Sequence, residues 1–390
     1  MNNEKSVPKL RFSGFDDEWK KSNLGNISSD EMYGMNSAAK DYDGFNKYIR
    51  ITDISETSNK FIPNPLTSPD GNLEDKYKLK KGDIVFARTG ASTGKTYLYD
   101  ENDGNLYFAG FLIKFHINNA NPKFIFYNTL KDEYLNWVSV MSVRSGQPGI
   151  NSNEYKKLPL NLPSLEEQKK ISNFLTSIDK KIELLENKHK YYQDFKRYLM
   201  QQIFAQKLRF ADNENWKTVK LGDVCKITMG QSPSSENYSE NNFHTVLIQG
   251  NADIINGKVV PRVYTSEITK ISKPGDIIMT VRAPVGDLAI NEFESCIGRG
   301  VCSIEGNKFI YYLLQSLKDN HVWERLSQGS TFESINSNDI KNLKVKMPSE
   351  ETQNTISLFL TEIDSKIELY EIQFLTFQKL KKGLLQQIFV

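Results

Sequence analysis

Hydrophobic residues recur at alternating intervals of four and three residues in two separate stretches of the chain. This alternation keeps one narrow seam of an α-helix apolar, which is typical of helices that pair in coiled coils. It predicts one long helix within residues 161–206 and another within residues 347–390, each roughly 60 Å long. The predicted helix–helix spacer residues are Ile171, Leu175, Ile178, Ile182 and Leu185 in the first helix, and Ile356, Leu360, Ile363, Ile367, Tyr370 and Phe374 in the second.

Short runs rich in β-branched and aromatic residues precede each predicted helix. Gly, Asp and Asn separate these runs, as in strands joined by turns. We expect strands at residues 48–52, 83–87, 96–99, 108–115, 244–249, 276–280 and 300–304. Helical spacing of apolar residues predicts further amphipathic helices at 124–137 and 309–326. The fold is therefore expected to be mixed α/β (α+β), with tandem globular domains over residues 1–160 and 207–346.

The two halves of the chain are copies of one unit. A constant shift of 185 positions (335 − 150 for the first pair) relates Ile150, Pro163, Gln168 and Phe204 to Ile335, Pro348, Gln353 and Phe389. The match is gapless through the predicted helices, whereas the globular parts share only landmarks. Because one domain lies between the helices, their pairing as an antiparallel coiled coil would give pseudo-twofold symmetry. The alternative packs each helix only on its own domain, and the strict heptad spacing argues against it.

Composition narrows the class of protein. Hydrophobic residues make up 38% of the chain, which is ordinary for a globular protein, and no apolar run approaches the roughly 20 residues that span a bilayer. The N-terminus is polar, and neither the three cysteines nor the four histidines have metal-ligand spacing. We expect a cytoplasmic protein with no metal site and no membrane contact. The net charge is only +2, so any nucleic-acid binding must come from local patches.

No stretch of the sequence carries a recognisable catalytic motif. The loop at residues 89–96 resembles a P-loop, but three residues separate Gly90 from Gly94 where a phosphate-binding loop has four. The segment Asn64-Pro65-Leu66-Thr67 lacks the second proline and the aromatic ring of an adenine methyltransferase loop. We predict no catalytic residue and interpret the Gly-rich loop as a contact surface.

Duplicated domains with divergent surfaces suggest that the chain recognises two different targets. If the target is duplex DNA, its base edges are read chiefly by Arg, Lys, Gln and Asn side chains. Two grooves on one face of the duplex lie roughly 34 Å apart, and a rigid helical spacer could fix such a distance. The candidate DNA-binding residues are Arg88, Thr89, Ser92, Lys95, Arg144 and Gln147 in the first domain, and Gln231, Arg282, Arg299 and Gln328 in the second.

These features together resemble the specificity subunit of Type I restriction–modification enzymes. The most specific marks are the helix starts at residues 162–168 and 347–353, each followed by an Ile-Asp-x-Lys-Ile-Glu-Leu segment. The Gly-Asp-Ile strands at Gly82 and Gly275 and the Gly-Arg-Gly at residues 298–300 also match. The resemblance covers nearly the whole chain.

The resemblance implies a target-recognition domain in each half, and each domain would read one half of a split, asymmetric DNA sequence. The helices would act as the spacer and as docking surfaces for two methylation subunits, which restriction subunits would join to form an ATP-dependent nuclease. Adenine methylation and DNA cleavage, with S-adenosylmethionine, ATP and Mg, would belong to these partners. This chain would be non-catalytic.

Three other interpretations remain open at this point. The chain could serve a related restriction system with different partners, which adjacent methylase and helicase–nuclease reading frames would reveal. It could be a coiled-coil scaffold whose domains bind proteins, and then it would not protect DNA from digestion. It could also use a nucleotide at residues 90–96, an idea that Lys95→Ala would remove if nucleotide binding did not change.

Overall fold

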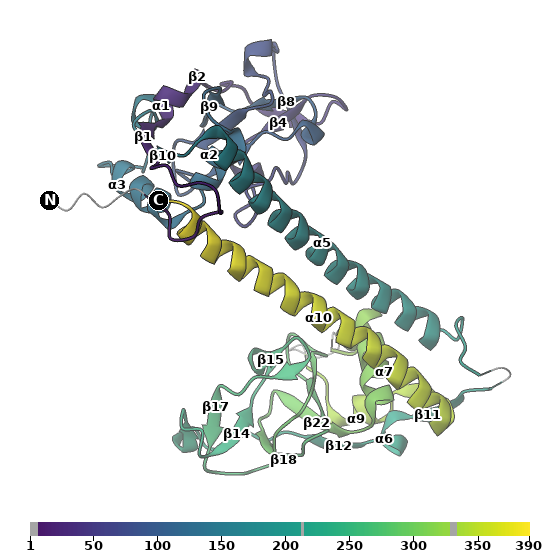
Figure 1. Ribbon diagram of the computed structural model, residues 1–390. Helices are drawn as coiled ribbons and strands as arrows, with labels where there is room; N and C mark the ends of the chain where they lie inside the picture. Colours follow the sequence, from purple (N-terminus) through teal and green to yellow (C-terminus); the bar gives the residue numbers. More distant parts are fainter. Residues whose placement is uncertain (1–6, 212–213, 328–333) are drawn as a thin grey trace. The chain divides into compact units, whose positions relative to one another are not determined.

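The computed structural model describes residues 7–211, 214–327 and 334–390 of the chain. The chain divides into two compact units, residues 1–185 with 373–390 and residues 186–372. Each unit contains one globular domain and parts of two long helices, α5 (Leu165–Phe204) and α10 (Glu350–Ile388). The expected mixed α/β fold with two domains and two long helices is confirmed (Figure 1).

A four-stranded antiparallel sheet lies at the centre of the first domain. Its strand β6 is buried on both faces, because Ile84 and Phe86 enter one hydrophobic cluster while Val85 and Ala87 enter another. The sheet order is β2 (Ser28–Tyr33), β9 (Leu112–Ile117), β6 (Asp83–Ala87) and β7 (Thr96–Leu98). The other strands pair as β1 (Lys20–Asn23) with β10 (Pro159–Leu162), β3 (Ala39–Asp41) with β5 (Thr67–Pro69), and β4 (Lys47–Ile49) with β8 (Leu106–Phe108).

Short helices complete the first domain. The α-helices are α1 (Leu24–Ile27), α2 (Pro122–Asn128), α3 (Asp132–Met141) and α4 (Ser152–Tyr155), and the 3-10 turns are η1 (Ile51–Asp53), η2 (Asp75–Tyr77) and η3 (Glu101–Asp103). Two expected elements are each divided in two. The run at 108–115 turns at Ala109, whose carbonyl accepts from the Leu112 N–H (2.9 Å). The helix expected at 124–137 stops at Thr129, whose hydroxyl bonds to the Phe126 carbonyl (2.7 Å).

Two larger sheets and one two-stranded sheet are found in the described part of the second domain. The six-stranded sheet has the order β12 (Lys226–Met229), β22 (Val301–Glu305), β19 (Ile277–Thr280), β20 (Leu288–Ile290), β16 (Lys258–Val259) and β15 (Ile254–Ile255). The five-stranded sheet has the order β13 (Tyr238–Ser239), β17 (Val263–Thr265), β14 (Thr245–Ile248), β21 (Ser295–Ile297) and β18 (Ile271–Ser272). Strand β11 (Lys217–Lys220) pairs with β23 (Lys344–Met347), as β1 pairs with β10 in the first domain.

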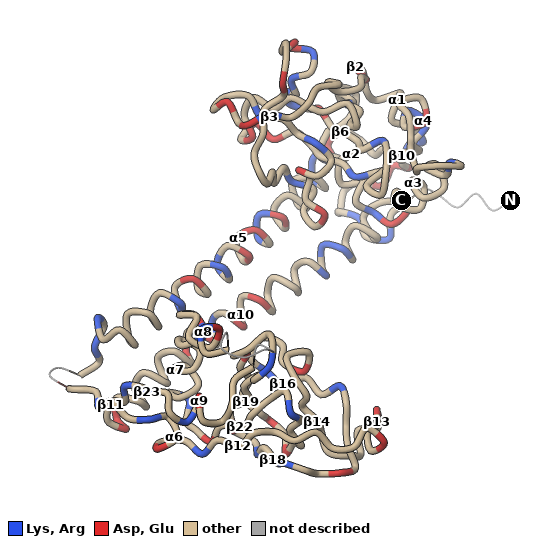
Figure 2. The backbone as a smooth tube through the Cα atoms, turned by 180° about the vertical axis from the view of Figure 1, so that it is seen from behind, with Lys and Arg blue, Asp and Glu red and all other residues tan. Residues whose placement is uncertain are grey.

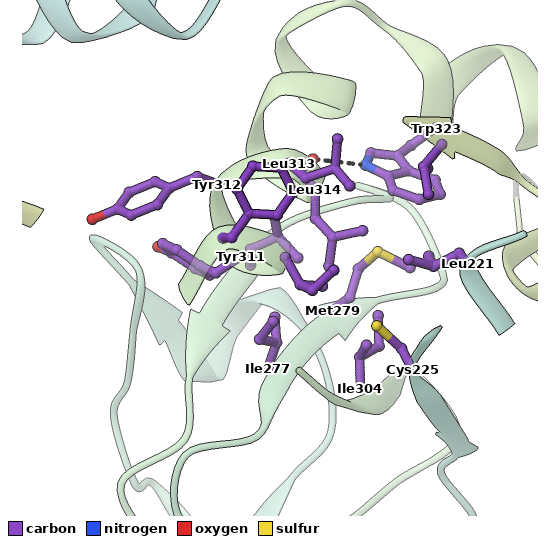
Figure 3. Packing of buried hydrophobic residues seen from close by; sticks show 14 of the residues in the cluster. Leu221, Cys225, Ile277, Met279, Ile304, Tyr311, Tyr312, Leu313, Leu314 and Trp323 are labelled. Carbon is purple, nitrogen blue, oxygen red and sulfur yellow. Dashed lines mark hydrogen bonds between the residues drawn. The ribbon is translucent and has the colours of Figure 1, made fainter. Parts of the chain in front are cut away.

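A helix packed on the six-stranded sheet forms the main core of the second unit. The helices are α6 (Leu221–Val224), α7 (Lys308–Asp319), α8 (Val322–Ser327) and α9 (Ser337–Lys341), with 3-10 turns η4 (Ser235–Asn237) and η5 (Asn251–Asp253). Figure 3 shows Leu313 and Leu314 of α7 above Ile277 and Met279 of β19. Trp323 closes this cluster, and its indole N–H donates to the Leu314 carbonyl (3.3 Å). The helix expected at 309–326 divides at Asn320 and His321, where His321 has a φ of 56°.

The long helices begin at signals that the sequence contains. The Ser164 hydroxyl accepts from the Glu167 N–H (3.3 Å), and Glu166 and Glu167 lie in the first turn, where the helix dipole favours acids. The second helix starts in the same way, with Glu350 and Glu351 in its first turn. Figure 2 shows Lys and Arg interspersed with Asp and Glu along both helices. Within the described residues, none of the helices is long and apolar enough to span a bilayer.

The two helices run antiparallel in each unit. In the first unit Asp179 of α5 pairs with Lys381 of α10 (2.6 Å), and Lys181 faces the Phe377 ring. In the second, Lys188 faces the Tyr370 ring and Lys196 pairs with Asp364 (2.7 Å). Residue numbers therefore rise along one helix as they fall along its partner, and the expected antiparallel pairing is found within each unit.

The spacer residues lie on the paired faces together with core residues of the domains. Ile171, Leu175 and Ile178 share a buried cluster with Phe124 of α2 and with Phe389, which follows α10. Ile356, Leu360 and Ile363 share the core of the second unit with the end of α5. Leu185 is buried, Ile182, Ile367 and Phe374 are partly buried, and the Tyr370 ring lies 5.4 Å from that of Tyr192.

A tyrosine, an aspartate and a lysine form the same hydrogen-bonded triad in each unit. The Tyr127 hydroxyl of α2 donates to the Asp179 carboxylate (2.7 Å), which also forms an ion pair with the Lys381 ammonium of the other long helix. In the second unit the Tyr312 hydroxyl of α7 donates to the Asp364 carboxylate (2.7 Å), which forms an ion pair with the Lys196 ammonium. Burial raises the pKa of both tyrosine hydroxyls, so both keep the proton that they donate. Each triad ties a domain helix to both long helices.

Candidate functional site

Each unit contains a surface hollow at the same place in its fold. The first hollow, about 600 Å³, lies where β2 and β6 end and where the turn between β8 and β9 passes over the end of β4. Its walls include Tyr33, Asn36, Arg50, Arg88 and Phe111. The second hollow, about 550 Å³, is framed by β12, β19, β14 and the turn before β22. Its walls include Ser232, Gln249, Asn251, Arg282 and Arg299.

The two hollows share one backbone frame. In the first unit the Met35 N–H donates to the Phe108 carbonyl (2.9 Å), and in the second the Gln231 N–H donates to the Ile297 carbonyl (2.8 Å). The preceding residues, Gly34 and Gly230, need to be glycine, because an added Cβ at either would lie under 3.0 Å from backbone carbonyl atoms of the facing segment. The frame is therefore duplicated even though most of the side chains that line it differ.

A buried carboxylate supports the floor of each hollow. Asp53 accepts from the Arg50 N–H (2.8 Å), and Asp253 accepts from the N–H groups of Gln249 (2.8 Å) and Gly250 (3.2 Å). Both aspartates lie in the 3-10 turns η1 and η5, which follow equivalent strands. Each carboxylate fixes the backbone at the position where a polar side chain lines the hollow.

The arginines of the first hollow are held by internal partners. Arg50 donates Nε (2.9 Å) and Nη2 (2.8 Å) to Asp53, and this hydrogen-bonded pair raises the pKa of the guanidinium. Arg88 donates Nε to the Gly110 carbonyl (3.0 Å), with its guanidinium 4.9 Å from the centre of the Tyr33 ring and 5.9 Å from that of Phe111. Cations over aromatic faces are held in place by the ring quadrupole. The first hollow therefore presents one preorganised cation, Arg88, between two aromatic rings, whereas Arg50 is held by Asp53.

The arginines of the second hollow are exposed and are not held in this way. Within residues 214–327 and 334–390, neither Arg282 nor Arg299 makes a side-chain hydrogen bond or ion pair. The backbone of Arg299 is nevertheless anchored, because its N–H donates to the Ser232 hydroxyl (3.2 Å). Together with Gln249 and Asn251, these side chains offer several donors to an acceptor-rich ligand.

The candidate residues from the sequence fall into distinct groups. Arg88, Arg282 and Arg299 line the hollows, and Gln231 is exposed beside the second one. Thr89 forms a backbone bridge with Gly149, Ser92 lies in the Gly-rich loop, and exposed Gln147 lies next to Gly90 of that loop. Gln328 lies outside the described residues.

Two of the predicted contacts are occupied within the first unit. The Lys95 ammonium, whose side chain is only 9% exposed, bonds to the Ile54 carbonyl (3.1 Å) and to Glu56. Arg144 donates Nη2 to both carboxylate oxygens of Glu154 (2.7 and 2.6 Å). As placed, both charges are satisfied internally, so the geometry does not support them as ligand contacts. It does not support a nucleotide at the Gly-rich loop either, since Lys95 would have to reach the phosphates.

The sequence interpretation missed several hollow residues. Arg50, Gln249 and Asn251 lie at or just after strands, where the pattern only indicated β-structure. Aligning the two halves at Asp53 and Asp253 would have revealed Arg50 and Gln249. Each of them is a polar residue directly after a strand and a few residues before the aspartate. In the described ranges, no three His, Cys, Asp or Glu side chains gather so that they could hold a metal ion.

Comparison with known proteins places these observations in a family. The family profile described as the type I restriction modification DNA specificity domain matches residues 16–191 and 213–375. A putative type I restriction enzyme MjaX specificity subunit of Methanocaldococcus jannaschii is 30% identical over 333 residues, covering 80% of this chain and 78% of the relative.

Solved structures show a similar fold. The S subunit of a type I restriction–modification system from M. genitalium matches with a TM-score of 0.64 at 16% identity, over 98% of this chain and 99% of that one. A chain from a study of complex assembly and conformational transition of the type I R-M system matches with a TM-score of 0.60 at 23% identity, over 97% and 99%. At these identities the likeness concerns the fold alone.

Proposed function

The chain belongs to the family of type I restriction–modification DNA specificity subunits, and we propose that each of its units reads one half of a bipartite, asymmetric DNA sequence. A specificity domain of this family occupies each half of the chain. The observation that carries the proposal is the pair of hollows, one frame lined by different side chains. A shared frame with divergent walls is what two half-sites of different sequence require.

The side chains at the hollows suit direct reading of base edges. Arginine pairs with the O6 and N7 acceptors of guanine, and Gln or Asn pairs with adenine, both in the major groove. Arg88 and Asn36 supply such groups in the first hollow, and Arg282, Arg299, Gln249 and Asn251 supply them in the second. The modest net charge of +2 supports a division of labour in which partner subunits add phosphate contacts.

The long helices would serve as the spacer and as the docking surface for two methylation subunits. Several apolar residues on the helices remain exposed, among them Phe174 and Leu380 in the first unit and Leu358, Leu369 and Ile372 in the second. Exposed apolar patches commonly mark protein–protein interfaces. Restriction subunits would join this complex, and S-adenosylmethionine, ATP and Mg would bind to the partners, so this chain would contribute specificity without catalysis.

Methylome sequencing tests the proposal directly. Co-expression of the chain with its methylation subunits in a host without other adenine methylation should produce N6-methyladenine at one split motif. The complex without this chain is the control and should leave no such motif. Methylation that is absent, or that follows a single unsplit motif, would refute the proposal.

A domain exchange tests the assignment of one domain to each half-site. Replacing residues 1–160 with the equivalent domain of a relative should change one half of the motif and leave the other half intact. The reciprocal exchange of residues 207–346 should change the other half. If either exchange altered both halves, the units would not read DNA independently.

A further inference from the structure

Two exposed arginines stand at the second hollow with their side chains unpaired. In the described part of the chain, the guanidinium groups of Arg282 and Arg299 have no carboxylate or carbonyl partner. An arginine fork without an internal partner keeps all of its donors for a ligand. The two forks together provide parallel N–H pairs of the kind that match two adjacent acceptors.

The backbone beneath both arginines is fixed while the side chains are free. Arg299 lies between Gly298 and Gly300, and a Cβ at Gly300 would lie under 3.0 Å from the Gln249 carbonyl, so the strands approach too closely for any side chain there. Arg282 follows Val281, whose N–H donates to the Gly300 carbonyl (2.9 Å), and itself bridges to Ser334. Binding would therefore cost the rotamer entropy of the two side chains but no further ordering of their backbone.

None of the described residues that line the second hollow carries a carboxylate. Hydroxyls, amides and the two arginines make up its polar side chains. The carboxylate beneath the hollow, that of Asp253, is occupied by the N–H groups of Gln249 and Gly250 and by Arg262 (3.4 Å). A ligand edge that carries acceptors only is therefore the best complement to the two guanidinium groups.

The first hollow differs at both of these positions. Gly298 and Ala109 correspond, because their N–H groups donate to the ends of the equivalent strands β14 and β4, so Arg299 corresponds to Gly110. Arg282 corresponds to Thr89, since each bridges to the strand segment before the last small helix of its domain. The two arginines are thus peculiar to the second half of the repeat.

From this arrangement we infer that the half-site read by the second unit contains guanine, and that Arg282 and Arg299 recognise its O6 and N7 acceptors. Guanine is the one base that presents two acceptors side by side in the major groove. The inference rests on the proposed function, because it requires that this unit contacts DNA bases. It extends that proposal by naming the base and the side chains.

Lysine substitutions separate base reading from phosphate binding. Arg299→Lys and Arg282→Lys keep the positive charge but lose the fork that bridges O6 and N7. Each variant, co-expressed with the methylation subunits, should relax one guanine position in one half of the motif. Loss of a bidentate pair should reduce discrimination against other bases by roughly 5- to 150-fold at that position. Arg209→Lys, an exposed arginine of the same unit outside the hollow, is the matched control and should keep the motif.

A nucleobase analogue tests the same contact with wild-type protein, so it does not depend on how a variant folds. Replacing the guanines of each half-site in turn by 7-deazaguanine removes N7 and leaves base pairing intact. The assembled complex should lose affinity at one or two guanines of the half-site that the second unit reads, which the exchange of residues 207–346 identifies. The lysine variant that relaxes such a position should show no further loss on that analogue.

The outcomes separate a failure of the guanine inference from a failure of the proposed function. A wild-type methylome without a split motif would refute the proposed function. A split motif in which neither 7-deazaguanine nor the lysine variants have any base-specific effect would refute the inference and leave the function standing. Lysine variants that keep the motif and show only a uniform change in salt-dependent affinity would assign the arginines to phosphates, which also overturns it.

Discussion

Removing the central carboxylate of the first triad should loosen the recognition domain from the long helices. Asp179 accepts from the Tyr127 hydroxyl (2.7 Å) and pairs with the Lys381 ammonium (2.6 Å). Tyr127 is buried, whereas Asp179 and Lys381 are 30% and 20% exposed. The variants Asp179→Ala, Asp179→Asn and Lys381→Met therefore remove different parts of one network.

The contacts indicate how the losses of unfolding free energy should rank among these variants. Asp179→Ala leaves a buried hydroxyl with only the longer contact to Thr176 (3.2 Å), which should cost about 1–3 kcal/mol for the unsatisfied group. The lost ion pair should add roughly 1 kcal/mol, since pairs this exposed are worth far less than fully buried ones. Asp179→Asn retains an acceptor for Tyr127 and should cost about 1 kcal/mol through the ion pair alone.

Native-state hydrogen exchange of the whole chain measures these costs locally. The free energy of opening should fall for peptides that cover α2 and the first half of α5, and it should change little for α7. The matched variant Asp364→Ala should do the reverse through Tyr312. If Asp179→Ala cost no more unfolding free energy than Asp179→Asn, Asp179 would not be the acceptor on which Tyr127 depends. If the costs of Asp179→Asn and Lys381→Met were additive within about 0.3 kcal/mol, the two residues would not form a stabilising ion pair.

Further variants test the frame, the core and the buried thiols. Gly230→Ala should destabilise the second unit by about 1–3 kcal/mol, because the added Cβ clashes with the facing backbone. Gly383→Ala has open space at its Cβ in α10 and should stabilise the first unit by roughly 0.5–1 kcal/mol. Native-state hydrogen exchange in each unit measures both changes. Trp323→Ala should cost about 3–5 kcal/mol in exchange of α7, and Trp323→Phe markedly less. Burial raises the pKa of Cys225 to about 11 and that of Cys302 to about 12. Both thiols therefore ionise more readily in the unfolded chain, so stability should fall as pH rises above 9. The Cys225→Ala/Cys302→Ala variant should show a shallower fall in urea unfolding between pH 8 and 10.

The long helices could be predicted because their information is local and periodic. Each seam is read from spacing alone, and the repeat confirms the register. The strand at Asp83–Ala87 agrees with the prediction to the residue, because Gly82 and Arg88 flank Asp83 and the apolar run that follows it. The break at Ala109-Gly110-Phe111 was missed because two apolar residues flank the glycine and hide the turn.

The candidate site was harder because side-chain partners come from distant parts of the sequence. In the sequence, Lys95 and Arg88 are both cations of one polar segment. In the fold, the Lys95 ammonium is already bonded to Glu56 and to the Ile54 carbonyl. The break at Thr129 likewise involves a tertiary contact, the hydroxyl of Thr96 at 2.7 Å. The sequence therefore proposed Arg88, Arg282 and Arg299 as candidates by residue type and position, and only the fold shows that they line the hollows and which charges have internal partners.

The first unit takes residues 373–390 into its core, where the rings of Phe389 and Phe124 lie 5.1 Å apart. The second unit needs only the continuous stretch 186–372. At typical translation rates, the segment that completes the first unit leaves the ribosome about 10–40 s after residue 185. During synthesis, the domain made first therefore keeps an apolar face open until residues 373 to 390 are made. Loss of these last 18 residues would harm the domain most distant from them in sequence.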